Sequence, residues 1–255
     1  MKLRRSVSPH QLLFALLAGL CLLISGAEGQ AQDQVVFRDG RTQEGKILGV
    51  ANHNVQIQVG AGRVGFPLAQ ITNIRMEAPP EVAAAQAAYT AGDYAKALAA
   101  TKALVDKYNG LPLPWARQAG GLLGDLYVEL GRNKEAEAAY TLFEKTYGGQ
   151  GGSARSAVGM ARIAVEGKDY AAAKERLEPV ITAALKEKNV PRGMGDAYSW
   201  AFTVMGQVNE AENDDAAALE NYLRTVTLFP QSEKAVSIAQ ARADALRQEK
   251  KVTVP

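Results

Sequence analysis

The chain has 255 residues, with 29 Lys and Arg against 27 Asp and Glu, and hydrophobic residues make up 47 % of it. This composition is typical of a globular protein and excludes a disordered or fibrous one. One cysteine, Cys21, and two histidines, His10 and His53, exclude a disulfide framework and a zinc site built from Cys and His. We expect no bound metal and no cofactor.

Residues 1–31 have the layout of a secretory signal peptide. Three basic residues precede an apolar run from Leu12 to Ile24, and residues 25–27 and 29–31 each fit an A-x-A-like cleavage site. The run has 13 residues, fewer than the roughly 20 that span a bilayer. We therefore predict a periplasmic or secreted protein without stable membrane insertion after cleavage; an uncleaved anchor is the alternative. Cleavage after Ala31 leaves 26 basic and 26 acidic residues, so net charge gives no argument for nucleic acid.

Residues 33–77 are rich in Val, Ile and Gly and have the pattern of a small β domain. We predict five short strands, near 34–37, 46–50, 55–59, 63–66 and 73–76, with a single helical turn at 68–71. Asp39-Gly40 and Asn52-His53-Asn54 mark turns, and strict alternation from Val55 to Val59 predicts one buried face. Five short strands must close on themselves to bury one core, which favours a five-stranded β-barrel.

Three features of this segment resemble the SH3-like and Sm-like small barrels of short exported bacterial modules. They are Asp39-Gly40, the following Gly45-Lys46-Ile47, and the late segment from Ile71 to Ile74. Some barrels of this kind bind RNA, but we expect no nucleic-acid binding here. Acidic residues offset part of the basic charge of the segment, and export separates the chain from cytoplasmic RNA.

Residues 80–250 follow the boundary Ala78-Pro79-Pro80 and are rich in Ala, Leu, Glu and Lys, which predicts helical hairpins. Four hairpins align on Ala97, Ala136, Ala173 and Ala218, at steps of 39, 37 and 45 residues. The best copy carries Leu123-Gly124, Tyr127, Gly131, Ala136, Tyr140 and Phe143. These residues resemble the tetratricopeptide-repeat (TPR) signature, although the steps exceed its period of about 34 residues.

The two resemblances imply a multi-domain α+β protein: a small five-stranded β-barrel at 33–77, an all-α TPR-like helical-hairpin solenoid at 80–250 and a flexible tail at 251–255. Small residues such as Gly124 and Ala218 let paired helices approach closely, and Tyr140 and Tyr222 fill the space between hairpins. A last helix from Glu233 to about Gln248 covers the end of the array.

Several motifs suggest chemistry but have simpler explanations. Residues 60–65 match G-x-G-x-x-G, yet Phe66-Pro67 follows where a dinucleotide site needs a helix, so we predict a hairpin turn. His53 is flanked by asparagines, and we place it exposed in a turn without catalytic partners. Asp214-Asp215 falls where a hairpin turns. We therefore predict no catalytic residue.

The TPR resemblance implies that the first helix of each hairpin lines a concave groove that binds a protein or peptide. The groove positions are Gln86, Tyr89, Asp125, Glu129, Arg155, Arg162, Glu166, Trp200 and Gln207. The Lys/Asn clamp of some family members is absent, since Gly121 and Asp125 occupy those positions in the second copy. The alternative is that Tyr89 and Trp200 pack between helices and that the charged residues form a solvated face.

These inferences favour a non-enzymatic scaffold or adaptor of the bacterial cell envelope that binds a protein segment in this groove. Two alternatives stay open. One is a self-associating structural component of the envelope, which would be a homo-oligomer. The other is a carboxylate-based hydrolase or a sugar-binding accessory protein.

Overall fold

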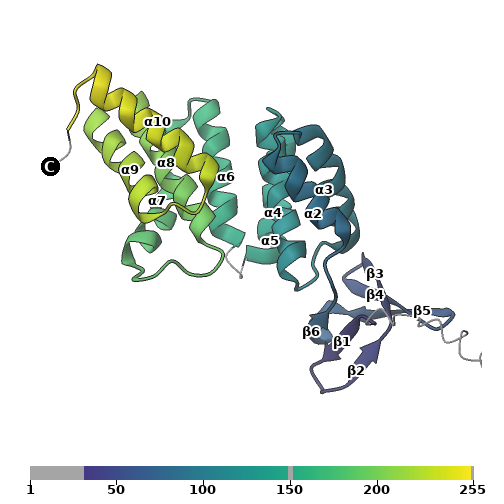
Figure 1. The fold of residues 1–255 in the computed structure, drawn as a ribbon. Helices are drawn as coiled ribbons and strands as arrows, with labels where there is room; N and C mark the ends of the chain where they lie inside the picture. Colours follow the sequence, from purple (N-terminus) through teal and green to yellow (C-terminus); the bar gives the residue numbers. More distant parts are fainter. Residues whose placement is uncertain (1–31, 149–151, 254–255) are drawn as a thin grey trace, which may run out of the picture.

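A computed structural model describes residues 32–148 and 152–253, so the predicted signal peptide and the end of the predicted tail lie outside the described residues. In the described part the protein is α+β, with two small antiparallel sheets followed by nine α-helices (Figure 1). The two sheets lie beneath the first helices, and the helices stand in a row that leads away from them.

Six strands form two three-stranded sheets, where the sequence predicts five strands in one barrel. The strands are β1 (Gln34–Phe37), β2 (Thr42–Glu44), β3 (Lys46–Ala51), β4 (Asn54–Val59), β5 (Gly62–Pro67) and β6 (Ile71–Arg75). Their orders are β2-β1-β6 and β3-β4-β5, and no closed barrel is found among the described strands. The additional strand, β2, has the sequence Thr-Gln-Glu, so no apolar alternation marks it. The predicted helical turn is the 3₁₀ helix η1 (Leu68–Gln70).

The predicted turns are confirmed. Asn52 and His53 adopt φ angles of 50° and 60° between β3 and β4, and both are exposed. The G-x-G-x-x-G segment forms the turn into β5 and most of that strand, as expected for a hairpin. The chain passes from one sheet to the other at Gly45, where a Cβ would lie 2.4 Å from the Gln58 carbonyl oxygen. Only glycine fits this crossing without a backbone shift.

The sheets share a hydrophobic cluster with the first helices. Val35, Val55 and Ile57 are fully buried or nearly so, as the alternation in β4 predicts. The same cluster includes Tyr108 and Trp115 from the helical region. This continuous cluster fixes the sheets against the start of the helical row.

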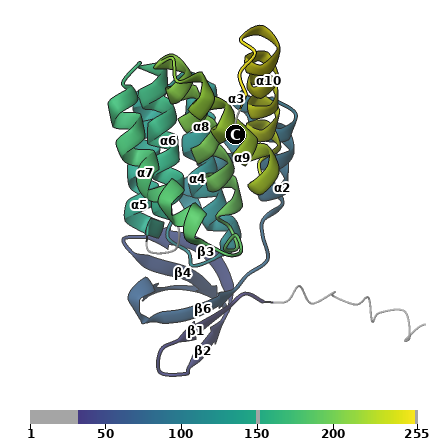
Figure 2. The same cartoon turned by 90° about the vertical axis from the view of Figure 1, so that its left-hand side faces the viewer.

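Eight helices form four antiparallel hairpins, and a ninth follows. They are α2 (Pro80–Thr90) with α3 (Tyr94–Tyr108), α4 (Pro114–Glu129) with α5 (Asn133–Tyr147), α6 (Gly152–Glu166) with α7 (Tyr170–Lys186), α8 (Gly195–Ala211) with α9 (Asp215–Leu228), and α10 (Glu233–Glu249). Figure 2 shows the row from a second side, and the last helix, α10, packs against α8 and α9. This arrangement is compatible with an α-solenoid.

The four hairpins repeat one turn geometry. Each turn contains a left-handed residue, and these are Gly92, Gly131, Lys168 and Asn213 with φ angles of 76°, 67°, 61° and 65°. Each lies five residues before one of the four aligned alanines, and all four alanines are fully buried. The alignment made from sequence therefore corresponds to a structural repeat.

Close helix contacts at small residues are also confirmed. Tyr140 is fully buried, and a Cβ at Gly124 or Gly159 would lie 2.4 or 2.1 Å from its ring. Tyr222 packs in the same way against Gly206, where a Cβ would lie 2.5 Å from the ring. The last helix, α10, buries four residues along one stripe and thereby covers α8 and α9, as predicted.

No helix among the described residues is both long enough and apolar enough to cross a membrane.

Candidate functional site

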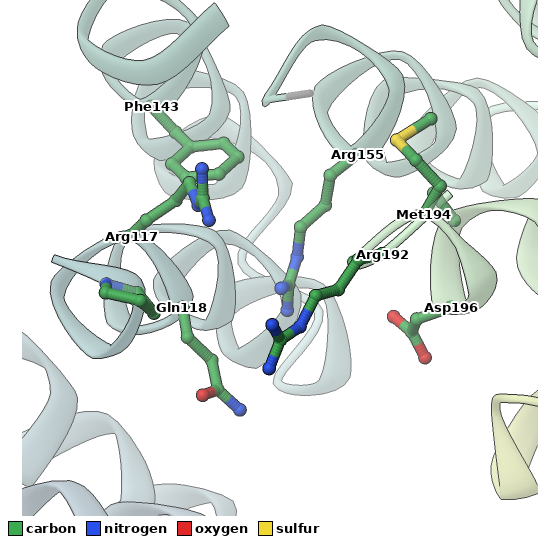
Figure 3. A pocket seen from close by; sticks show the side chains of 10 residues that line it. Arg117, Gln118, Phe143, Arg155, Arg192, Met194 and Asp196 are labelled. Carbon is green, nitrogen blue, oxygen red and sulfur yellow. The ribbon is translucent and has the colours of Figure 1, made fainter. Parts of the chain in front are cut away.

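The first helices of the hairpins form the wall of a cleft made of two adjoining hollows. One hollow has a volume of about 490 Å³ and the other about 780 Å³, and they share Gln118, Arg155 and Asp196. We call the smaller one the arginine end, because Arg117, Arg155 and Arg192 line it (Figure 3). The larger one is the tyrosine end, lined by Tyr89 and Tyr94 together with the start of α10.

The structure brings five of the nine predicted groove residues to the cleft surface. Gln86, Tyr89, Asp125, Arg155 and Trp200 all line the tyrosine end, and Arg155 also lines the arginine end. Their helices are α2, α4, α6 and α8, as the resemblance implies.

Four predicted residues do not line either hollow. Glu129 and Arg162 form an ion pair of 2.8 Å at the edge of the cleft, with side chains 10 % and 14 % exposed. Glu166 is exposed and accepts a hydrogen bond of 2.9 Å from Asn133 on α5. Gln207 is half-buried on α8. Glu166 and Gln207 therefore lie outside the two hollows.

Asp125 is the centre of the wall. Its carboxylate accepts a hydrogen bond of 2.6 Å from the Tyr140 hydroxyl and forms an ion pair with Arg155. Burial acts to raise the pKa of Asp125, but Arg155 and Arg162 outweigh it and hold the pKa below its usual value. Arg155 reaches this position across Gly121, where a Cβ would lie 2.6 Å from the guanidinium. The glycine at the absent clamp position thus makes room for an arginine.

A second group of charges joins the two ends of the helical row. Glu129 on α4 also forms an ion pair with Lys234 of α10, and the Lys234 ammonium donates a hydrogen bond of 3.2 Å to the Tyr94 hydroxyl. Arg162 lies over the Trp200 ring, 4.1 Å from its centroid. Trp200 is 8 % exposed and belongs to the core of the second half, so packing is its main role.

Tyr89 is more exposed to solvent than Trp200. It is half-buried, and its ring centroid lies 5.7 Å from that of Tyr94. Burial, together with the nearby carboxylates of Asp125 and Glu129, raises the pKa of Tyr89, so its hydroxyl stays protonated at neutral pH.

The structure adds residues that the sequence did not indicate. Arg192 and Asp196 come from the loop before α8 and from the first turn of α8, and Lys234 comes from α10. Desolvation in the concave cleft, with a further contribution from Asp125, raises the pKa of Asp196 against the opposing charge of Arg155. The sequence contains one hint for Arg192. It lies between Pro191 and Gly193, in the long connection before the fourth hairpin.

Paired charged side chains make up much of this wall. Asp125 and Glu129 are both engaged by arginine, so they are not presented as a free pair of acid and base. Across residues 32–148 and 152–253, no group of three His, Cys, Asp or Glu side chains could hold a metal ion. The site is an open, polar cleft with aromatic side chains at one end and guanidinium groups at the other.

The fold and the cleft define an α+β protein with a helical-repeat-like array and an open, polar cleft along it. No protein-family model matches the sequence, and no curated protein or solved structure gives a significant match.

Proposed function

We propose that this protein is a non-catalytic adaptor that holds an extended segment of another protein in the cleft. The observation that carries the proposal is the continuity of the cleft, whose two hollows share three residues and touch α2, α4, α6, α8 and α10. A surface that crosses several repeats suits an extended chain, because each repeat can contact successive residues of it.

The proposal also includes the structural class of the adaptor and its location in the cell. The regular hairpins support a TPR-like solenoid, and the crossing of the chain between two sheets at Gly45 supports an SH3-like or Sm-like small barrel. The signal-peptide layout of residues 1–31 supports export to the bacterial cell envelope.

Selection of phage-displayed random peptides on the purified full chain tests this function. Gln118 is exposed on α4 and lines both hollows, so Gln118→Trp fills the cleft without disturbing the core. Gln240 is exposed on α10 and lines neither hollow, so Gln240→Trp is the matched control. We expect selected peptides to bind the wild type and Gln240→Trp, and to lose most of their affinity for Gln118→Trp.

Peptides that bind all three proteins equally would place the binding surface outside the cleft. A selection that enriches no peptide would contradict the adaptor function itself.

Self-association is a second candidate, supported by the free edge of one sheet. Among the described strands β5 pairs only with β4, and Val59 and Val64 beside this edge are 37 % and 42 % exposed. An exposed apolar edge strand can pair with another chain. Size-exclusion chromatography at two concentrations, with the wild type and Val64→Lys, would detect an oligomer and show whether this edge forms it.

A further inference from the structure

The arginine end of the cleft concentrates positive charge. Arg117 lies in the first turn of α4, Arg155 lies in the first turn of α6, and Arg192 lies in the loop before α8. Figure 3 shows the Arg192 side chain extending toward Gln118, with Arg155 behind it. Among the described residues that line this hollow, Asp196 is the one acidic side chain.

The three arginines do not have equivalent partners. Arg155 is committed to Asp125, and Asp196 also faces it. Arg192 is exposed, and no ion pair or hydrogen bond joins its side chain to another residue within the described ranges. Arg192 is therefore the guanidinium group of this hollow that remains open to a ligand.

The N-terminal ends of two helices add to the positive charge at the arginine end. Pro114, at the start of α4, lines the arginine end, as do Gly193 and Met194 just before α8. Helix N-termini carry a partial positive charge, which reinforces that of the guanidinium groups. The tyrosine end differs, because its described lining residues include three acidic side chains, Asp125, Asp196 and Glu233, and two basic ones, Arg155 and Lys234.

We infer that the arginine end binds an acidic stretch of the protein segment that occupies the cleft, with Arg192 pairing to its carboxylates. This inference rests on the proposed adaptor function and specifies the chemistry of the partner. Arginine suits the role because its planar guanidinium can bond both oxygens of a carboxylate. The opposite character of the tyrosine end gives the bound segment a fixed direction, with its acidic stretch next to α8.

Fluorescence anisotropy with labelled model peptides tests the inference on the full chain. The probes are a peptide of alternating Glu and Ala, and the same peptide with Gln or with Lys in place of Glu. We expect the Glu peptide to bind most tightly and to weaken as salt is added, because the contacts are exposed charge pairs. Arg192→Gln should weaken its binding roughly fivefold.

Arg176→Gln is the matched control, since Arg176 is exposed on α7 and lines neither hollow. It should leave the affinity unchanged, and melting curves should show all variants equally folded. Equal binding of the Glu, Gln and Lys peptides, or an equal loss in Arg176→Gln, would overturn the inference. Binding of a phosphoserine peptide without binding of the Glu peptide would overturn it in favour of a phosphate ligand.

The two proposals fail in different ways. If display selection yields neutral or basic peptides that Gln118→Trp loses, the adaptor function stands and the acidic partner is contradicted.

Discussion

Tyr140 shows how one side chain connects the packing of the repeats to the charged wall of the cleft. Its ring fills the space between Gly124 on α4 and Gly159 on α6, and its hydroxyl bonds Asp125. Burial and the Asp125 carboxylate both raise the pKa of Tyr140, so the hydroxyl stays protonated and remains a donor at neutral pH. Packing and charge placement thus depend on the same residue.

Gly159→Ala should be strongly destabilising. The new Cβ would lie 2.1 Å from Cζ of Tyr140, whose fully buried ring has no free space to enter. We expect a loss of about 2–3 kcal/mol in the free energy of unfolding, measured by urea denaturation. Gly167→Ala is the control, because the nearest atom to its Cβ is 3.5 Å away. An effect of Gly159→Ala no larger than that of the control would contradict the packing.

Asp196 should limit stability at neutral pH. Its pKa is raised in the folded protein, so its charged form is less stable there than in the unfolded chain. Asp196→Asn should therefore increase the free energy of unfolding at pH 7. The increase should shrink as the pH falls through the folded pKa and vanish well below the unfolded pKa of about 3.9, where the wild-type carboxyl is protonated in both states. Urea denaturation of both proteins across this pH range measures it, and a gain that persists at low pH would refute the assignment to charge.

At the scale of the element, the four hairpin turns differ in the residue that adopts the left-handed conformation. Gly92 and Gly131 occupy the left-handed position in the first two turns, whereas Lys168 and Asn213 occupy it in the last two. A lysine in this conformation crowds its own Cβ against the backbone, and glycine avoids this cost.

Lys168→Gly should therefore stabilise the protein by about 1 kcal/mol, seen as a higher midpoint of urea unfolding. The reverse change, Gly131→Lys, should destabilise it by a similar amount. Lys168 is exposed, so loss of its side chain removes no buried contact. Changes of the same sign in the two variants would argue against the turn geometry.

The elements and the cleft differ in how far they could be predicted from sequence. Alanines recur at corresponding positions of the sequence, so four hairpins could be aligned without a structure, and the structure shows these alanines buried after left-handed turns. The strand β2 could not, since all three of its residues are polar. Positions on the first helices predicted Asp125 and Arg155, but Arg192 and Lys234 reach the cleft from a loop and from the last helix, which only tertiary packing determines.

The misplaced groove residues have a geometric cause. Arg155 and Glu166 are eleven positions apart on α6, which corresponds to about 16 Å along a helix. The cleft lies near the beginning of α6 and α8, and Glu166 and Gln207 lie near their ends. The choice of helix was correct, but sequence spacing does not say how far along a helix a cleft extends.

For the whole molecule, the main long-range connection beyond neighbouring repeats is made by Lys234. It joins α10 to Glu129 on α4 and to Tyr94 on α3, across 105 and 140 residues of sequence. Its ammonium also lies 5.2 Å from the centroid of the Tyr94 ring. A row of repeats bends most easily along its length, because each unit contacts chiefly its neighbours. A link between the first and last parts of the row therefore sets the width of the tyrosine end.

Lys234→Ala should widen the cleft. Glu129 retains Arg162, so the local structure should persist while the link to α10 is lost. We expect double electron–electron resonance between spin labels at Ala87→Cys and Gln240→Cys, in a Cys21→Ser chain, to show a longer and broader distance distribution. Both label positions are exposed, on α2 and α10. Lys250→Ala is the matched control, since Lys250 pairs with Asp215 on the adjacent helix and so does not cross the cleft. If the distributions of the two lysine variants coincide, the packing of the repeats alone sets the width of the cleft. The ion pair between Lys234 and Glu129 then has no effect on that width.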